Sequence, residues 1–292
     1  MSRYRFIHAE RANYPVTVLC RVLRVARAAY YAWARRGVSA RAQADEELAG
    51  RIAAAYARSR RTYGAPRVHA ELRAQGVRCA RKRVARLMRA AGLVGRRRRR
   101  RVRTTVAEPM RPPAPNLVAR DFTAAAPDRL WVGDSTHVAT TEGWLYRAGL
   151  VDAYSRRVVG WSMADHLRTA LTLDALAMAL QARRPGAGLV HHTDRGSQYT
   201  AAAYQAALSA RGVAVSMSRA GECLDNAMAE RFFATLKAEF VDTQRWPPRA
   251  AARQAIFEWL EAFYQRQRRH SALAYQSPTR FEDMLLLHDH AA

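Results

Sequence analysis

A run of six consecutive arginines at residues 96–101 separates this chain of 292 residues into two parts. Six like charges in a row repel one another, so such a run cannot be packed into an apolar core. The prolines that follow, Pro109, Pro112, Pro113 and Pro115, favour an extended segment. Since the chain is about twice as long as one typical domain, we expect a folded unit on each side of a linker at residues 96–120.

The two parts differ strongly in charge. The whole chain has 49 basic and 24 acidic residues, which gives a net charge of +25. Residues 1–120 contain 30 of the basic residues and 6 of the acidic ones, whereas residues 121–292 contain 19 and 18. A GC-rich coding sequence accounts for arginine in place of lysine, but it does not account for an excess confined to one end. A polyanionic partner is therefore expected, and nucleic acid is favoured over a merely solvated basic surface.

A membrane location and an oxidising compartment are both disfavoured. No stretch approaches the ~20 apolar residues that span a bilayer, and the first ten residues lack the apolar run of a signal peptide. Cys20, Cys79 and Cys223 are isolated from one another, so neither a disulfide framework nor a cysteine-rich zinc site is indicated. We expect a cytoplasmic protein without a membrane partner.

The first part has the pattern of a helical DNA-binding region. Apolar residues recur every three or four positions in 16–33 and in 45–59. Two shorter helices are expected at 66–75 and 80–91, around a turn at Gly76, and they form a candidate helix-turn-helix. Such pairs also occur in ordinary helical domains, but the adjoining charge favours DNA. The basic residues expected to contact DNA are Arg81, Lys82, Arg83 and Arg86 of the second helix and Arg96, Arg97, Arg98, Arg99, Arg100 and Arg101 of the linker.

The second part changes to the pattern of an α/β domain. Three strands are expected in succession, at 130–139, 144–151 and 158–163, and strands then alternate with helices. The later elements are helices at 169–183, 201–210 and 227–240, strands at 189–192 and 213–217, and a final helix at 249–266. Strands in succession followed by alternation predict a mixed sheet.

Three carboxylates lie on separate elements of this second part. Asp134 lies in the middle of the strand WVGDSTHV, on the face where an apolar residue is expected. Asp194 follows a short strand at its carboxyl end, where ligands gather in open α/β sheets, and Glu230 lies in the first turns of a helix. Taken singly, each has an ordinary explanation: a buried ion pair for Asp134, a cap for Asp194 and a solvated helix face for Glu230.

The combination of the three carboxylates favours a metal site. Carboxylates within ~4 Å of each other repel by on the order of 1–4 kcal/mol per pair, and a divalent cation removes that cost. Oxygen ligands without a surrounding cluster of histidine or cysteine select Mg²⁺ or Mn²⁺, and two such ions support in-line phosphoryl transfer. Lys237 lies two helical turns after Glu230 on the same face, where we expect it to contact a phosphate near the metals.

Four segments of the second part, WVGDSTHV, HHTDRGSQYT, SMSRAGECLDNAMAERFFATLKAEF and YQRQRRHSALAYQSP, resemble the core of bacterial insertion-sequence transposases. The resemblance is to the second-frame (OrfB-type) proteins of the IS-three-like family, whose core is similar to that of retroviral integrases. Fifty-nine residues separate Asp134 from Asp194 and 35 separate Asp194 from Glu230, which matches the family's signature. Residues 59–95 resemble the family's helix-turn-helix segment, so the resemblance covers nearly the whole chain.

The resemblance implies a fold, a reaction and a division into domains. The fold is a ribonuclease-H-like mixed-sheet catalytic domain preceded by an all-α helix-turn-helix region. Asp134, Asp194 and Glu230 are expected to bind two Mg²⁺ or Mn²⁺ ions, and the reaction is DNA strand cleavage and joining by a terminal 3′-hydroxyl. The expected divisions are a helical DNA-binding region at 1–95, the linker at 96–120, the catalytic core at 121–285 and a tail at 286–292.

The resemblance also implies partners and a location. DNA is expected as element ends and as target, with copies of the chain assembled on it. The segment that recognises element ends is largely encoded by an upstream frame in this family, so a partner protein or a fusion is expected as well. The expected location is a bacterial cytoplasm, at the nucleoid.

The chain departs from the family's pattern in a few places that leave the three carboxylates intact. Glu222 stands where Asn is usual, Ala274 where Gly is usual and Gln265 where Asn is common. Asp225 and Asn226 match the family, and we interpret them first as the N-terminal cap of the helix at 227–240, with support of the metal ligands as a second role. Asp152 is expected to be structural or to support those ligands.

Two other functions stay open at this point. One is a nuclease of the same fold that hydrolyses DNA without joining it. The other is a DNA-binding regulator derived from a transposase, with a silent core. The regulator is disfavoured because a silent core has no need of all three carboxylates.

Overall fold

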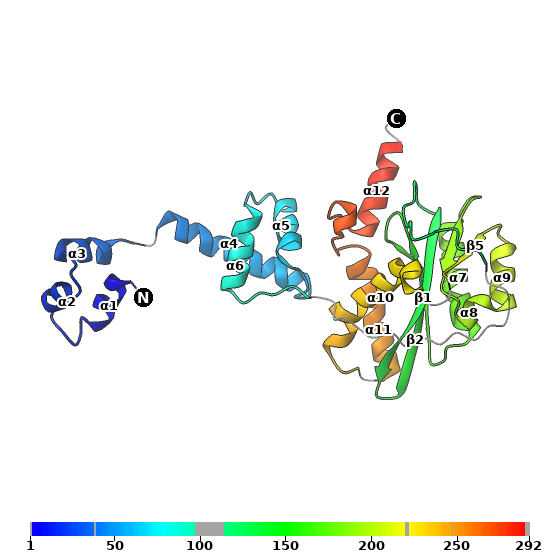
Figure 1. The fold of residues 1–292 in the computed structure, drawn as a ribbon, viewed down its shortest axis with the longest axis horizontal. Coiled ribbons are helices and arrows are strands. Elements are labelled where there is room, and N and C mark those ends of the chain that lie inside the picture. Colours follow the sequence, from blue (N-terminus) through cyan, green and yellow to red (C-terminus); the bar gives the residue numbers. More distant parts are fainter. Residues whose placement is uncertain (1, 38, 97–113, 220–221, 247, 290–292) are drawn as a thin grey trace.

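The computed structural model describes residues 2–37, 39–96, 114–219, 222–246 and 248–289. Figure 1 shows one group of helices at the N-terminal end, a second group of helices in the middle, and a larger domain built on a sheet at the other end. Five of the arginines predicted to contact DNA, Arg97, Arg98, Arg99, Arg100 and Arg101, lie outside the described residues. No helix in the described ranges is long and apolar enough to cross a membrane.

The first three helices form a small unit with a core of its own. They are α1 (Arg3–Glu10), α2 (Val16–Val22) and α3 (Arg27–Arg35). The buried residues of this core are Ile7, Leu19, Cys20 and Tyr30. The helical pattern at 16–33 is divided by a turn in which Arg24 has a φ of 53°. Helix α1, whose N-cap is Ser2, was not predicted.

The next three helices form a second unit, and the last two of them are the pair predicted as a helix-turn-helix. They are α4 (Ala40–Arg58), α5 (Ala65–Ala74) and α6 (Arg81–Ala90). Helix α4 begins at Ala40 and not at residue 45, because Ser39 caps it: the Ser39 hydroxyl accepts a hydrogen bond from the Ala42 N–H at 3.2 Å. The predicted break between α5 and α6 is present, and Gly76 adopts a φ of 77° there, which glycine tolerates without strain.

The predicted mixed sheet is present and has five strands, in the order β3-β2-β1-β4-β5. The strands are β1 (Leu130–Thr140), β2 (Gly143–Asp152), β3 (Val158–Ala164), β4 (Val190–Thr193) and β5 (Ala214–Met217). Strands β1, β2 and β3 pair antiparallel, whereas β4 runs parallel to both β1 and β5. This places the end of β4 beside the middle of β1.

Helices cover both faces of the sheet. One face packs against α7 (Thr169–Arg183), α8 (Ser197–Thr200) and α9 (Ala202–Ser209). The other packs against α10 (Ala227–Glu239), α11 (Arg249–Glu258) and the π-helical turn η3 (Trp259–Tyr264). Shorter 3-10 turns are η1 (Cys223–Asn226), η2 (Val241–Thr243) and η4 (Ser271–Leu273). The last helix, α12 (Pro278–Asp289), was not predicted.

The helix-turn-helix region is docked on the C-terminal part of the α/β domain, and one continuous apolar core joins the two. The buried Tyr63 hydroxyl accepts a hydrogen bond from the Arg269 N–H at 2.7 Å. Arg67 and Arg268 both pair with Glu239 at the end of α10, at 3.3 and 2.7 Å. The C-terminal end of helix α10 therefore contacts the helix-turn-helix region through Glu239.

Residues 114–120 lie against the α/β domain. The Leu117 N–H donates to the Ser216 hydroxyl at 2.9 Å, and the Met217 N–H donates to the Pro115 carbonyl at 3.2 Å. The boundaries proposed from the sequence, at 95, 120 and 285, stay a prediction.

Candidate active site

Asp134 lies on β1, on the sheet face that α10 covers. Its partner across the β1–β2 register is Gly149, and a side chain there would begin only 3.3 Å from the Phe233 ring of α10. Glycine at this position therefore lets α10 approach the strand closely. One carboxylate oxygen of Asp134 accepts a hydrogen bond from the Ser135 N–H at 2.7 Å. The prediction that Asp134 takes the place of an apolar residue on an inward face is confirmed.

The pKa of Asp134 is raised well above its ordinary value. Burial is the largest cause, and the negative charge of Asp194 is the next that raises it. Glu230 also raises this pKa, whereas the Ser135 N–H and the charge of Lys237 lower it. The charges of Asp194, Glu230 and Lys237 therefore all act on one half-buried carboxylate.

Asp194 follows β4 directly, at the carboxyl end of the strand. Because β4 is parallel to β1, with His192 opposite Val132, the chain leaves β4 beside Asp134. One oxygen of Asp194 accepts a hydrogen bond from the Gly196 N–H at 3.0 Å. Burial raises the pKa of Asp194 and outweighs that hydrogen bond.

Glu230 and Lys237 lie on α10, and both side chains are half-buried. In the part of the chain that the structure describes, no group of three or more His, Cys, Asp or Glu side chains is arranged to hold a metal ion. The three acidic residues are related through electrostatic repulsion, since the charges of Asp194 and Glu230 both disfavour ionisation of Asp134. The predicted roles of Asp134, Asp194, Glu230 and Lys237 in metal and DNA binding stay predictions.

Tyr199 is a residue of the site that the sequence reasoning missed. It lies on α8 and is only 2% exposed. Its pKa is raised well above the ordinary value, first by burial and then by the charges of Asp134 and Asp194, while a hydrogen bond with Ser135 opposes the shift. Tyr199 lies within HHTDRGSQYT, but periodicity gives no sign that the charge of a strand carboxylate acts on an aromatic residue of a short helix.

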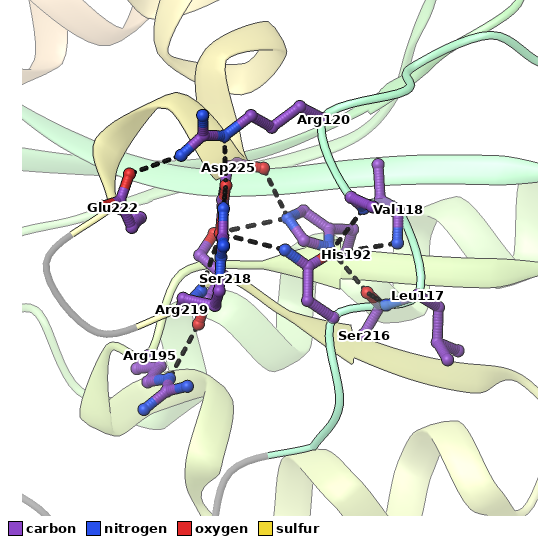
Figure 2. Close-up of polar contacts among 12 residues, drawn as sticks. Leu117, Val118, Arg120, His192, Arg195, Ser216, Ser218, Arg219, Glu222 and Asp225 are labelled. Carbon is purple, nitrogen blue, oxygen red and sulfur yellow. Dashed lines mark hydrogen bonds and ion pairs between the residues drawn. The ribbon is translucent and has the colours of Figure 1, made fainter.

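Asp225 is compensated by cations, and Figure 2 shows it between Arg120 and Arg219. Its carboxylate accepts hydrogen bonds from Arg120 Nε at 2.8 Å and from Arg219 Nε at 2.9 Å. Asn116 Nδ2 donates to it at 3.0 Å. These contacts, with that from Arg219 the strongest, hold the pKa of Asp225 well below its usual range.

The interpretation of Asp225 and Asn226 as a helix cap is confirmed only in position, since Asn226 is the N-cap residue of α10. Neither side chain makes a capping hydrogen bond to α10. Asp225 instead holds the segments that carry Arg120 and Arg219, and Asn226 donates from Nδ2 to the Gly133 carbonyl at 3.1 Å. Asn226 thus ties the start of α10 to β1 next to Asp134, which positions the helix that carries Glu230.

Asp152 has a structural environment. Its buried carboxylate accepts hydrogen bonds from the N–H groups of Asp128 at 2.7 Å, Tyr154 at 3.0 Å and Ser155 at 2.9 Å. Burial nevertheless raises its pKa. The contacts fix the turn that follows β2, which accords with the structural alternative stated for this residue.

The basic residues predicted to contact DNA divide into two groups. Arg81 and Lys82 are exposed at the start of α6. Arg83 and Arg86 both pair with Asp45 of α4, each at 2.6 Å, so part of their charge is compensated within the protein. Their contact with DNA stays a prediction.

Family models match both parts of the chain. Models described as "Integrase core domain" match residues 124–223 and 211–278. A model described as "HTH-like domain" matches residues 43–101. With the mixed sheet, these matches confirm the predicted ribonuclease-H-like catalytic domain preceded by a helical region.

Curated relatives match nearly the full length. "Transposase InsF for insertion sequence IS3A" of Escherichia coli (strain K12) is 40% identical over 283 residues, which cover 96% of this chain and 98% of the relative. "Insertion element IS600 uncharacterized 31 kDa protein" of Shigella sonnei is 43% identical over 265 residues, which cover 91% of this chain and 97% of the relative.

Two solved structures are similar to the α/β part. The HTLV-2 integrase catalytic core domain in complex with magnesium has a TM-score of 0.43 at 18% identity and covers 55% of this chain and 99% of its own. The catalytic domain of Mos1 mariner transposase has a TM-score of 0.40 at 18% identity, with 46% and 71% covered.

Proposed function

We infer the function of the chain from its family: it belongs to the insertion-sequence transposases represented by InsF of IS3. We propose that it cuts DNA at the ends of an insertion element and joins them to a target, and that Asp134, Asp194 and Glu230 carry the reaction. The observation that supports these residues is the raised pKa of Asp134 and Asp194. Burial is the largest cause at both residues, and the charges of Asp194 and Glu230 add to the shift at Asp134. Among the described residues, no arginine forms an ion pair with either carboxylate as Arg120 and Arg219 do with Asp225.

The donor set fits a hard divalent cation. Cores of this family generally depend on divalent metal, and we propose two Mg²⁺ or Mn²⁺ ions bound by Asp134, Asp194 and Glu230. All three offer oxygen ligands, which these ions prefer. When bound, such ions activate the attacking oxygen and stabilise the leaving oxygen of a phosphodiester.

The other residues of the chain hold the site in position. Phe233 packs over Gly149 and keeps α10 close to β1, while Asn226 fixes the start of the same helix to the Gly133 carbonyl. Tyr199 is buried in the core on the α8 side of the sheet, close enough to feel the charges of Asp134 and Asp194. Lys237 supplies positive charge beside them, suited to a phosphate of the DNA.

DNA and further chains are the proposed partners. Arg81 and Lys82 are exposed and suited to phosphate contacts, and Arg83 and Arg86 become so when DNA competes with Asp45. We also propose assembly of several copies on DNA, and recognition of element ends with an upstream-frame protein or fusion. The proposed setting is the nucleoid of a bacterial cell.

Strand joining on a pre-cut DNA end tests the proposal, because such an end lessens the need for the upstream-frame segment. In Mg²⁺ or Mn²⁺, we expect Glu230→Gln to lower the joining rate at least about a thousandfold, or about 4 kcal/mol in activation free energy. Glu46→Gln, an exposed glutamate of α4, is the matched control and should join DNA at the parent rate.

Joining by Glu230→Gln at the parent rate would contradict the assignment of this residue. Hydrolysis without joining, by the parent and with the upstream-frame protein added, would favour the nuclease. DNA binding without any metal-dependent reaction under those conditions would favour the regulator with a silent core.

A further inference from the structure

A cleft of about 220 Å³ lies where the helix-turn-helix region meets the C-terminal part of the α/β domain. Its charged lining residues are Arg58 and Glu71 from the helical region and Arg266, Arg269 and Arg280 from the C-terminal part. Four cations and one anion from two separate regions therefore face the same space. None of the residues that line the cleft belongs to the site of Asp134, Asp194 and Glu230.

The charge of the cleft is not balanced within the protein. Glu71 accepts a hydrogen bond from Arg269 Nε at 2.7 Å, which compensates those two residues. Arg58, Arg266 and Arg280 are exposed, and none of them forms an ion pair with another residue that the structure describes. We call this cleft the arginine cleft, after Arg58, Arg266 and Arg280. Three net positive charges therefore line it.

The walls of the arginine cleft are held by buried contacts. Tyr63 lines the cleft, is 3% exposed and accepts the Arg269 N–H at 2.7 Å. Close behind it, Glu239 of α10 pairs with both Arg67 and Arg268. Because these contacts fix one region against the other, the spacing of arginines from the two regions is set before any ligand binds. Because the two regions are already held together, an anion that binds arginines from both does not have to offset the entropic cost of bringing the regions together.

The surroundings favour an extended polyanion over a single small anion. The chain leaves the helical region at Arg96, whose N–H donates to the Thr62 carbonyl at 3.0 Å, next to Tyr63 of the cleft wall. Arg96 is the first residue of the six-arginine run. Positive charge therefore continues from the cleft into the start of that run, as the backbone of a nucleic acid requires.

We propose that the arginine cleft binds the phosphodiester backbone of DNA and so fastens the helix-turn-helix region and the catalytic domain to one DNA segment. The site rests on the proposed function in that DNA is the substrate. It assigns Arg58, Arg266 and Arg280 to backbone contacts, in addition to the arginines of α6 and of the linker. Guanidinium groups suit this role because their paired N–H donors match two phosphate oxygens.

The test is the salt dependence of DNA binding by the full chain. The triple variant Arg58→Gln, Arg266→Gln, Arg280→Gln is compared with the matched control Arg168→Gln, Arg211→Gln, Arg253→Gln. The control removes three exposed arginines outside the cleft and the same total charge. Fluorescence anisotropy with a labelled duplex gives the slope of log Kd against log salt. We expect the slope of the cleft variant to fall in magnitude by about 2.7, at about 0.9 per lost phosphate contact, and that of the control to stay near the parent value.

Equal slopes for the parent and the cleft variant would overturn the proposal. Equal losses in both triple variants would also overturn it, since a general charge effect would then suffice. Binding of inorganic phosphate at the cleft, with the DNA slope unchanged by the substitutions, would identify a small-anion site in its place. Single variants Arg58→Gln and Arg280→Gln, each expected to lose about one contact, guard against a folding defect in the triple variant.

Failure of this proposal and of the proposed function can be told apart. Asp134→Asn should keep the parent salt slope, because its carboxylate is not part of the cleft. If the salt slope of DNA binding is unchanged in Asp134→Asn and reduced in the cleft variant, DNA binding at the arginine cleft is supported, whether or not the protein joins strands. Conversely, strand joining that depends on Glu230 while the cleft variant keeps the parent slope supports the proposed function and refutes the cleft.

Discussion

The α/β domain holds two sets of acidic side chains that have opposite surroundings. Asp225 is bound by Arg219 and Arg120, and its pKa is held well below the ordinary value. Asp134 and Asp194 are half-buried, but their pKa values are raised, and the cation whose charge lowers the pKa of Asp134 is Lys237. The difference shows that the chain supplies arginine where a carboxylate organises the protein. Among the described residues, no arginine forms an ion pair with Asp134 or Asp194, where, in our proposal, a metal ion supplies the positive charge.

Substitution by asparagine at one residue of each set should change stability in opposite directions. We expect Asp225→Asn to lower the free energy of unfolding at pH 7 by about 2 kcal/mol. A fully buried pair costs about 3–5 kcal/mol to break, and the value is smaller here because both arginines are largely exposed. Metal-free Asp134→Asn should be more stable than the parent by about 1 kcal/mol, since a buried repelled charge is removed. Urea denaturation measures both, with the exposed Asp242→Asn as a control that should have no effect.

The pH dependence of the two variants sharpens the same comparison. The lowered pKa of Asp225 means that its contribution is complete above the ordinary aspartate value of about 3.9 and is lost as the pH falls through the folded value. The deficit of Asp225→Asn should therefore shrink in acid. The raised pKa of Asp134 has the opposite sign: without metal, the parent loses stability as the pH rises from about 4 toward neutrality, so the advantage of Asp134→Asn should grow. The same trend in both variants would break the comparison.

Arg147 tests whether the carboxylates are truly uncompensated, with an expected effect as small as that of Asp134→Asn. It is fully buried on the strand face of Asp134, and burial lowers its pKa to about 10. Its three guanidinium nitrogens have no hydrogen-bond partner among the described residues, and the group lies 5.1 and 5.5 Å from the ring centroids of Phe232 and Phe233. We expect Arg147→Met to raise the free energy of unfolding by about 1 kcal/mol. The substitution removes the cost of burying a charged guanidinium, and this cost exceeds the stabilisation lost with the cation–π contacts.

Thermal or urea unfolding of Arg147→Met provides that measurement, and Arg253→Met on the exposed face of α11 is its control. A fall in stability of more than about 1 kcal/mol would mean that the positive charge of Arg147 offsets the acids on its strand face. Asp134 would then be partly compensated by an arginine, as Asp225 is, and the contrast between the two sets of carboxylates would be weaker.

The elements that carry the acids could be predicted from the sequence because their signals are local. The alternation around Asp134, the strand that ends before Asp194 and the helical periodicity around Glu230 each depend on residues within one or two turns. The matches to the integrase-core models confirm the fold that these patterns and the resemblance implied. The start of α4 was missed because its acidic residues at 45–47 suggested a first turn, although Ser39 provides the actual cap.

The contacts that distinguish the two sets of carboxylates could not be predicted in this way. Arg120 is 105 residues from Asp225 in sequence, and Arg67 is 172 residues from Glu239. Pairs at such separations leave no periodic trace in a single sequence, which is why Asp225 was interpreted as a local cap. The arginine cleft was hidden for the same reason, since Arg58 and Arg280 become neighbours only when the two regions dock.

The most direct test of the uncompensated carboxylates is calorimetric titration of the DNA-free chain with Mn²⁺. We predict saturable binding by the parent, unchanged binding by Asp242→Asn, and a loss of affinity of more than about a hundredfold in the double variant Asp134→Asn, Asp194→Asn. Equal Mn²⁺ affinity in the parent and the double variant would contradict the account, because the metal would then be held by other groups.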